Sequence, residues 1–271
     1  MTINFTNANL QSFKDEAIKA AKLGGKELIS RMGKVEVREK QPRDLVTEAD
    51  FASQKAIQEH LLGKFPEHRF LGEESEEKLL DVAPDEYCWI VDPLDGTVNY
   101  VHQLNSFSVS IALRKGNETL VGVVYDPVIG EMFWAAAGEG AYLNDQRIEP
   151  SGCTDLYKAL VVCSFSSSAN RDHPEVERFL RVLGNAGSIR RLGSAALNLC
   201  FVACGRSDAY WAASLNCWDV AAGLLILSEA GGLAKTFAGN EVDLFKPQFC
   251  AASTIEVFEQ MQQYLNLDQS N

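Results

Sequence analysis

The sequence predicts an α/β protein whose N-terminal half has an α+β arrangement. Three patterns in its 271 residues indicate this class. Near the N-terminus, apolar residues recur at three- and four-residue steps, as in amphipathic helices. In the middle of the chain, apolar and polar residues alternate between turn signals, as in strands. In the second half, short apolar runs alternate with helical stretches, as in an α/β layer.

The first expected elements are two helices. The apolar positions between Leu10 and Met32 predict the first helix. The second is expected from Thr47 to Phe65, because Pro66 follows. Its start carries the segment "TEAD", in which Thr47 is followed three residues later by an acid, the pattern of a capping box.

Strands are expected next. The apolar run "YCWIVD" predicts one strand, and the stretch from Ser106 to Ile148 predicts an antiparallel meander with turns at Lys-Gly-Asn, Asp-Pro-x-x-Gly and Asn-Asp. Beyond it, strands such as "ALVVCSF" alternate with helices such as "HPEVERFLRVL" and "SAALNLCFVAC". The polar segment from Glu149 to Asp155 is the expected boundary. We therefore expect an α+β domain over 1–150, with the antiparallel sheet and acidic metal-binding motifs, and an α/β domain over 151–271 that completes the active site.

The composition excludes several classes of partner. A formal charge of −12 argues against a broad basic surface for nucleic acid, because such binding neutralises phosphates with Lys and Arg. The seven cysteines are odd in number and lack paired CxxC spacing, which favours reduced thiols over a disulfide framework or a zinc ribbon. Neither a leader pattern nor an apolar stretch of ~20 residues is visible. We expect a soluble cytoplasmic protein with no nucleic-acid or membrane partner.

The stretch "WIVDPLDGTVNYVH" is the first candidate for chemistry. Asp92 and Asp95 flank a Pro-Leu pair, and the Leu94 carbonyl can point between them, an oxygen arrangement that hard divalent cations prefer. Gly96 permits a tight backbone path, and a short helix from Thr97 would turn its N–H groups toward an anion. A plain surface turn explains the same residue types equally well.

Two other segments contribute single acids. "LGEESEE" follows a probable strand, so Glu73 could supply another carboxylate and polarise a water on the metal. Taken alone, a solvated acidic loop explains it better. "NCWDVAAGLLILSEAGG" predicts a helix from about Asp219 that stops at Gly231-Gly232. Taken alone, this aspartate is better explained as a helix N-cap than as a ligand.

Nucleophilic catalysis by side chains is not indicated. The four histidines are scattered, and each is better explained as a surface or packing residue than as a base or ligand. The segment "SFSSSAN", Ser164 to Asn170, could donate hydrogen bonds to a substrate, but a serine-rich turn is the better explanation.

Together the segments "DLVTEAD", "GEES", "DPLDGTVNY" and "WDVAAGLLILSEAGG" resemble the inositol monophosphatase family of metal-dependent, often lithium-inhibited sugar-phosphate phosphatases. The resemblance covers roughly Leu10 to Phe258, and "IRRLGSAALNLCFVACGRSDAYW" resembles the family's substrate-side segment. It implies a layered αβαβα sandwich of the inositol monophosphatase and fructose-1,6-bisphosphatase type. It also implies a homodimer, two to three Mg²⁺ ions and a small phosphorylated substrate.

The resemblance also implies a set of metal ligands. Glu73, Asp92 and the Leu94 carbonyl would hold one ion. Asp92, Asp95 and Asp219 would hold a second, and Glu73 would help with a third.

Further roles follow from the same resemblance. Asp50 matches an outer-shell acid that orients water, and Thr97 with Glu73 would position the attacking water. The N–H groups of Gly96 and Thr97 would hold phosphate oxygens. The residues expected around the substrate are Leu94, Asp95, Gly96, Thr97, Gly193, Ser194, Ala195 and Asp219.

Two positions depart from the family pattern. Inositol-specific members carry a glutamate seven residues before the helix aspartate, where this chain has Ala212. The loss of a carboxylate that accepts bonds from inositol hydroxyls costs about 1.5–3 kcal/mol per charged hydrogen bond, so inositol phosphate is expected to be a poor or secondary substrate. Lys40 lies near the place of a basic residue that the family often keeps before "DLVT", but its offset differs by one.

The expected function is Mg²⁺-dependent hydrolysis of a small phosphate monoester, an inositol-1-phosphate-like polyol or sugar phosphate, by metal-activated water. Fructose-1,6-bisphosphate, histidinol phosphate and 3′-phosphoadenosine 5′-phosphate stay open as substrates, although "GTVNY" in place of a "GTKEF"-like ending disfavours the nucleotide. A non-catalytic member that binds phosphate or a protein partner is the alternative class. Such a protein would have a broken ligand set, whereas all the expected ligands are present here.

Overall fold

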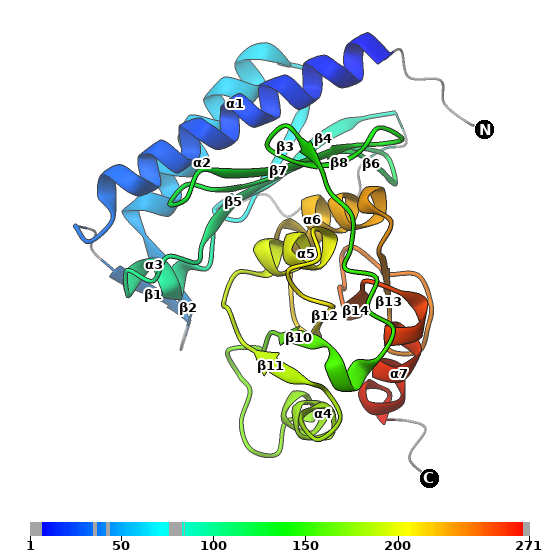
Figure 1. The fold of residues 1–271 in the computed structure, drawn as a ribbon. Coiled ribbons are helices and arrows are strands. Elements are labelled where there is room, and N and C mark those ends of the chain that lie inside the picture. The colour runs from blue at the N-terminus through cyan, green and yellow to red at the C-terminus, as the bar shows by residue number, and fades with distance from the viewer. Residues whose placement is uncertain (1–6, 35–36, 42–43, 76–82, 84, 268–271) are drawn as a thin grey trace.

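The computed structural model describes residues 7–34, 37–41, 44–75, 83 and 85–267. The described elements form two helices, a seven-stranded sheet, two helices, a five-stranded sheet and two outer helices. Figure 1 shows that these layers stack in this order. The expected αβαβα sandwich is therefore confirmed. The layer helices are α1 (Asn7–Arg31) and α2 (Glu48–Lys64), then α5 (Ala195–Ala203) and α6 (Cys217–Ala230), then α4 (Pro174–Leu183) and α7 (Ile255–Leu265).

The two N-terminal helices lie close to their expected bounds. The expected capping box at the start of α2 is confirmed: the Thr47 hydroxyl accepts from the Ala49 N–H at 3.1 Å, and Asp50 Oδ2 accepts from the Thr47 N–H at 2.9 Å. Just before α2, β1 (Val37–Gln41) and β2 (Asp44–Thr47) form a two-stranded antiparallel sheet.

The seven-stranded sheet contains the expected meander. Its order is β3-β4-β5-β6-β7-β8-β9, and every neighbouring pair is antiparallel except β3 with β4. The strands are β3 (Arg69–Gly72), β4 (Tyr87–Asp95), β5 (Ser108–Lys115), β6 (Glu118–Asp126), β7 (Glu131–Ala136), β8 (Gly140–Leu143) and β9 (Gln146–Arg147). A short helix, α3 (Thr97–Val101), lies between β4 and β5, as the sequence predicts.

The second half forms a mixed sheet of order β11-β10-β12-β14-β13. Two of its pairs, β10 with β11 and β10 with β12, are parallel, while β14 is antiparallel to β12 and β13. Its elements are η1 (Leu156–Lys158), β10 (Leu160–Cys163), β11 (Ser188–Arg190), β12 (Ala209–Ala212), β13 (Leu233–Lys235) and β14 (Phe249–Ala252).

Three apolar cores hold the layers together. One packs α1 and α2 on the seven-stranded sheet, and one packs α4 and α7 on the five-stranded sheet. The third lies between the sheets around α5 and α6 and contains buried residues from both halves, such as Ile90 and Tyr210. Burial of this kind is the main favourable term in folding. The division into domains 1–150 and 151–271 stays a prediction.

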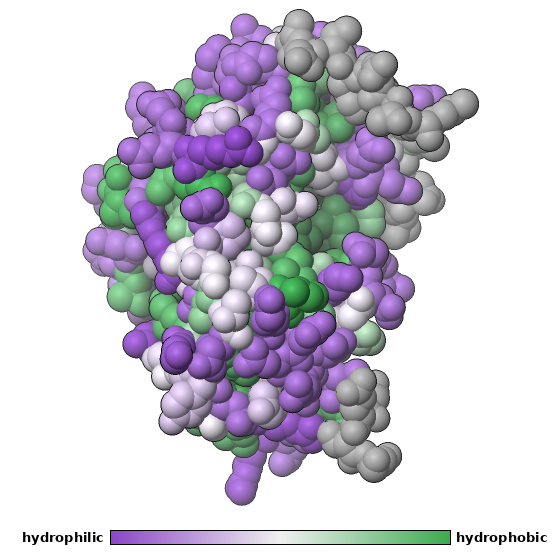
Figure 2. Space-filling model, turned by 45° about the vertical axis from the view of Figure 1, so that its right-hand side comes forward, coloured by the Kyte–Doolittle hydropathy of each residue, from purple (hydrophilic) through white to green (hydrophobic). Residues whose placement is uncertain are grey.

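The outer surface is largely polar. Figure 2 shows mainly hydrophilic side chains on one face, interrupted by smaller hydrophobic patches. None of the helices in the described part of the chain is both long and apolar enough to span a bilayer. All seven cysteines are free thiols.

Candidate active site

The site begins where β4 loses its regular pairing with β5. Asp92 pairs with Ser110 and Asp95 with Ser108, and the register shifts between the two pairs. Asp92 Oδ1 accepts from the Leu94 N–H at 2.9 Å, which closes a tight turn around Pro93. Two aspartates three residues apart therefore lie together at the C-terminal end of β4.

A pocket of about 240 Å³ opens beside this turn. It brings together segments that are far apart in the chain, including the loop after β3, the start of α5 and the start of α6. Every expected metal ligand lines it. The lining residues are Glu73, Asp92, Leu94, Asp95, Gly96, Thr97, Ser164, Phe165, Arg191, Gly193, Ala195, Leu215, Asn216 and Asp219.

Like charges crowd this pocket. Burial raises the pKa of Asp92 well above its usual value, and the carboxylates of Glu73, Asp95 and Asp219 raise it further. The pKa of Asp219 is also raised well above its usual value, by burial first and then by Asp95 and Glu73. Such crowding of carboxylates becomes favourable when a cation lies among them.

The donor set fits a hard divalent cation. Carboxylate and backbone carbonyl oxygens are the ligands that Mg²⁺ prefers, and the pocket offers both kinds. In the described part of the chain, no three or more His, Cys, Asp or Glu side chains lie in an arrangement that could hold a metal ion as they stand, so the four acids would have to adjust around an ion. The carboxylates of Asp92 and Asp219 each accept one backbone N–H bond, and a carboxylate has about four acceptor sites, so acceptor capacity remains.

Asp95 lies in a different environment from Asp92. Its oxygens accept from the Ala195 N–H at 3.0 Å and from the Ala196 N–H at 2.8 Å, both at the start of α5. The Ser194 hydroxyl also donates to it. Burial raises the pKa of Asp95, and the Ser194 hydroxyl and these two N–H groups oppose the shift. Asp95 thus ties the β4 turn to the N-terminus of α5.

Ser194 supports the pocket without lining it. It is fully buried, caps α5 by accepting from the Leu197 N–H at 3.2 Å, and is not among the lining residues. Its expected neighbours in the substrate loop, Gly193 and Ala195, do line the pocket.

Asp50 and Thr97 connect α2 to the site. Asp50 Oδ2 accepts from the Thr47 hydroxyl at 2.7 Å, and its Oδ1 accepts from the Thr97 hydroxyl at 3.4 Å. The same Thr97 hydroxyl lies 3.1 Å from the Leu94 carbonyl oxygen. Burial raises the pKa of Asp50 to about 6, against the opposing bonds from Thr47. Asp50 therefore contacts Thr97, which lines the pocket, but does not line the pocket itself.

Two glycines allow the chain segments to meet. Gly96 and Gly193 have φ angles of 97° and 93°, in the left-handed region that favours glycine. A Cβ atom on Gly193 would lie 2.5 Å from Asn99 Nδ2. That amide donates to the carbonyls of Ser106 and Leu192, both at 2.7 Å, and so fastens the loop before α5 to α3.

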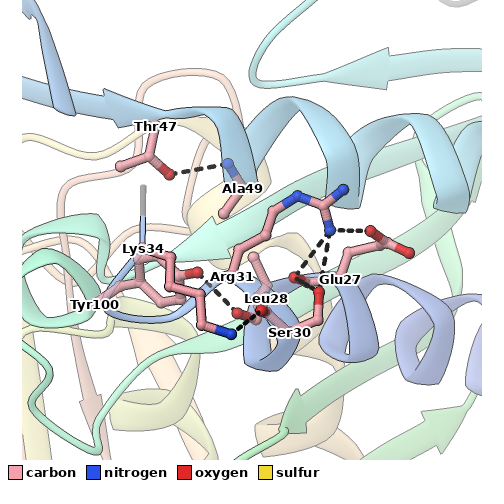
Figure 3. Close-up of polar contacts among 8 residues, drawn as sticks. All are labelled: Glu27, Leu28, Ser30, Arg31, Lys34, Thr47, Ala49 and Tyr100. Atoms are coloured by element: carbon pink, nitrogen blue, oxygen red, sulfur yellow. Dashed lines mark hydrogen bonds and ion pairs between the residues drawn. The ribbon is translucent and has the colours of Figure 1, made fainter. Parts of the chain in front are cut away.

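The other side of α3 is held by α1. The Tyr100 hydroxyl donates to the Leu28 carbonyl at 2.7 Å, near the end of α1. Figure 3 shows this contact beside the Thr47 cap of α2 and the polar side chains at the end of α1. The helix that presents Gly96 and Thr97 is therefore anchored from two directions.

The alternative role suggested for Asp219 is wrong. The N-cap of α6 is Asn216, and Asp219 is the third helical residue. Its Oδ2 accepts from the Asn216 N–H at 2.7 Å, as the acid of a capping box does. The helix also begins two residues earlier than expected, at Cys217.

The histidines lie away from the pocket, as expected from the sequence. His68 stacks between Phe65 and Tyr87, and burial lowers its pKa. His60 lies 2.7 Å from Glu16, and His173 caps α4. In the serine-rich segment, Ser164 and Phe165 line the pocket.

One of the two departures from the family pattern lies in the described structure. Ala212 is fully buried at the end of β12, belongs to the apolar core around α5 and α6, and is not among the residues that line the pocket. The side chain of Lys40 lies outside the described residues.

Sequence reasoning missed several residues of the site. Arg191 is the one Lys or Arg among the lining residues of this pocket, and its guanidinium lies 5.5 Å from the Phe165 ring centroid. Asn99 lies in the segment "GTVNY" and Arg191 in "IRRLGS", both next to residues that the sequence assigns to the site. Their position beside these motifs is the feature of the sequence that could have identified them. A second hollow of about 380 Å³ continues from the pocket past Arg191 and Asn99 to Leu45.

Comparisons with known proteins show which sequences and structures this chain resembles. The sequence model described as "Inositol monophosphatase family" matches residues 9–267. "Inositol monophosphatase 2" of Solanum lycopersicum is 44% identical over 245 residues, which cover 87% of this chain and 91% of that protein. "Fructose-1,6-bisphosphatase/inositol-1-monophosphatase" of Aquifex aeolicus is 40% identical, over 83% of this chain and 86% of that protein. The crystal structure of "extragenic suppressor protein suhB" from Bartonella henselae superposes with a TM-score of 0.88 at 32% identity, covering 94% of this chain and 99% of that one.

Proposed function

The chain belongs to the inositol monophosphatase family, and on this premise we propose that it is a Mg²⁺-dependent phosphatase that hydrolyses small polyol or sugar phosphates. The observation that carries the proposal is the pocket in which four acids from three separate segments meet, and in which burial and the neighbouring carboxylates raise the pKa values of Asp92 and Asp219. A phosphate monoester dianion repels nucleophiles, so its hydrolysis needs this kind of cation-collecting site.

The ligand set follows the family pattern. Glu73, Asp92 and the Leu94 carbonyl would hold one ion, Asp92, Asp95 and Asp219 a second, and Glu73 would contribute to a third. Bound Mg²⁺ supplies neutralisation of the phosphate charge and lowers the pKa of water.

The chain's own residues position the nucleophile and the phosphate. Glu73 would accept a proton from the attacking water, and the Thr97 hydroxyl would orient that water. Asp50 supports this role, because it lies within 3.4 Å of the Thr97 hydroxyl and can fix its direction. The N–H groups of Gly96 and Thr97 precede the first hydrogen-bonded turn of α3 and would donate to phosphate oxygens.

The alcohol portion of the substrate would lie against Gly193, Ala195, Phe165 and Arg191. Because position 212 is an alanine, no carboxylate on β12 is available to accept bonds from inositol hydroxyls. Inositol phosphate is therefore proposed as a secondary substrate relative to sugar or other polyol phosphates.

We propose further that the protein acts as a cytoplasmic homodimer. Seven free thiols are typical of a reducing compartment. Light scattering coupled to size exclusion would test the dimer, which has a mass twice the 29.8 kDa of the chain.

The function is tested by phosphate release from a panel of phosphomonoesters, with Mg²⁺, with EDTA, and with Mg²⁺ plus Li⁺. The panel contains inositol 1-phosphate, fructose 1,6-bisphosphate, histidinol phosphate and 3′-phosphoadenosine 5′-phosphate. We expect turnover of at least one polyol or sugar phosphate that requires Mg²⁺ and is inhibited by Li⁺. Absence of metal-dependent turnover on every ester would favour a non-catalytic binding role instead.

A further inference from the structure

A second site candidate lies at the far end of β5, away from the carboxylates. A hollow of about 380 Å³ opens there between the β5–β6 turn, the body of α6 and the loop before β14. Its size falls within the range of about 300–1,000 Å³ that is typical of small-molecule sites. The lining residues are Arg114, Asn117, Thr119, Ala221, Leu224, Val242, Asp243, Leu244 and Phe245.

Arg114 is the unusual residue in this hollow. Only 6% of its surface is exposed, and among the described residues no carboxylate forms an ion pair with it. Its Nη2 donates to the Asn117 carbonyl at 2.6 Å, while its buried Nε has no partner. A guanidinium offers five N–H donors in a fixed fork, so most of its donor capacity is unused.

A buried cation without a counter-charge is unfavourable. Burial lowers the pKa of Arg114, and the thiols of Cys217 and Cys88 and the carboxylate of Asp243 oppose the shift. Asp243 is exposed, and its Oδ1 accepts from the Phe245 N–H at 2.9 Å. The protein thus keeps an arginine in a position where a carboxylate or phosphate oxygen would form strong, charge-assisted bonds.

The rest of the hollow is suited to an apolar group. The Phe245 ring lies with its centroid 5.5 Å from the guanidinium carbon, and Leu224, Val242 and Leu244 complete the wall. Leu224 and Val242 also line an adjoining hollow of about 370 Å³, so the space continues along α6. A convergent cation with an apolar surround is the usual composition of a site for a small amphipathic anion.

We propose that this hollow binds a small organic anion, with its carboxylate or phosphate group on Arg114 and its apolar body against Leu224 and Phe245. The site is separate from the acidic pocket, although both share α6: Asp219 lies in the first turn of the helix, and Ala221 and Leu224 follow it. The proposal does not depend on phosphatase activity.

The test measures binding by calorimetry with three probes on the full-length protein. Benzoate and phenylphosphonate carry the two anionic groups, and benzamide is the neutral counterpart. We expect at least one anion to bind about tenfold more tightly than benzamide. Comparison of the affinities of benzoate and phenylphosphonate then shows whether Arg114 prefers a carboxylate or a phosphonate group. If phenylphosphonate bound in the acidic pocket instead, its affinity would stay the same when Arg114 is substituted.

Three variants locate the binding. Arg114→Met removes the charge and keeps an unbranched apolar stem, and Leu224→Trp fills the hollow while Arg114 remains; each should weaken anion binding about tenfold or more. Arg147→Met, which removes an exposed arginine on β9, should leave it unchanged. If Arg114→Met fails to fold, Leu224→Trp still tests the site. The proposal is overturned if neither anion binds at millimolar concentrations, if benzamide binds equally well, or if binding survives in the folded variants.

Discussion

The two ends of β5 carry unbalanced charge of opposite sign. At one end, Ser110 and Ser108 pair with Asp92 and Asp95, and four carboxylates share a pocket. At the other end, Arg114 pairs with Cys88, and its buried guanidinium forms no ion pair among the described residues, although the exposed Asp243 lines the same hollow. The same physical rule applies to both, because a buried charge is unfavourable unless a partner compensates it. Each end therefore has a buried charge that a ligand of opposite sign would compensate.

The two ends of β5 differ in how many hydrogen bonds fix the residues around them. At the acidic end, Asn99, Tyr100 and Asp95 connect α3, α1 and α5 around the turn. At the basic end, Arg114 has a single carbonyl bond and an aromatic ring beside it. A reaction requires such fixed geometry, whereas simple binding does not.

The largest effect is expected for Asp92→Asn. The asparagine side chain has the same shape as aspartate and still accepts the bond from the Leu94 N–H. It removes the negative charge that the three neighbouring acids repel. We expect turnover to fall by about 10³-fold or more, since metal ions supply several kcal/mol of stabilisation to such reactions. In EDTA, the melting temperature should be unchanged or higher, because like-charge repulsion is relieved.

Asp126→Asn is the matched control. Asp126 is 3% exposed, and its Oδ1 accepts from the N–H two residues on, Val128, at 2.9 Å, the same local geometry as Asp92. It should retain near-normal kcat. Near-normal kcat in Asp92→Asn as well would show that the ligand assignment is wrong.

The next effect concerns the frame around the pocket. Gly193→Ala places a methyl group 2.5 Å from Asn99 Nδ2 and forces a side chain into a φ of 93°. We expect a loss of about 1–3 kcal/mol in the free energy of unfolding, measured by urea denaturation, together with reduced kcat. Gly138→Ala has a φ of 79° with nothing within 4 Å of the new atom, so it reports the backbone cost alone. Equal losses in both variants would mean that the Asn99 contact contributes nothing.

A third prediction concerns pH. The pKa of Asp50 is raised to about 6 in the folded protein, so the folded state binds this proton more tightly than the unfolded state. The resulting contribution to stability is fully present below pH ~4, the usual pKa of Asp, and is lost as the pH rises through about 6. It amounts to about 3 kcal/mol by the standard conversion.

Asp50→Asn should therefore flatten the pH dependence of the unfolding free energy between pH 4 and 7. Glu59→Gln, which changes an exposed acid on the same helix, should leave the slope intact. Activity of the wild type should fall as the pH drops through 6, because protonation of Asp50 removes the negative charge that strengthens its bond from the Thr97 hydroxyl. An identical slope in Asp50→Asn and the wild type would contradict the assigned burial effect.

The smallest effect is expected at position 212. Ala212→Glu places a carboxylate at the position where inositol-specific members of the family carry a glutamate, and it should raise kcat/KM for inositol 1-phosphate, relative to other esters, by about tenfold. The ratio of the two kcat/KM values is the measurement, because it cancels any general loss of active protein. An unchanged ratio would remove Ala212 as the reason for weak inositol recognition.

Local patterns explain which parts were predictable. The capping box at Thr47, the Asp92–Asp95 turn and the meander depend on neighbours within a few residues, so the sequence indicates them directly. The bond from Asn99 to Leu192 joins residues 93 positions apart, and the bonds from α5 to Asp95 span about 100. Such contacts depend on how layers dock, which no local spacing encodes. The lone guanidinium of Arg114 is visible only after that docking.

The same reasoning explains the error at Asp219. Both Asn216 and Asp219 are favoured near helix starts, and the choice between N-cap and third helical residue depends on where the preceding strand ends. The structure places the cap earlier, which frees Asp219 to serve both the capping box and the pocket.

The most direct test of the central claim is an anomalous diffraction map from crystals grown with Mn²⁺ in place of Mg²⁺. The account predicts strong peaks within coordination distance of Asp92, flanked by Glu73 on one side and Asp219 on the other. A map without peaks in this pocket, collected from protein that is active with Mn²⁺, would contradict it.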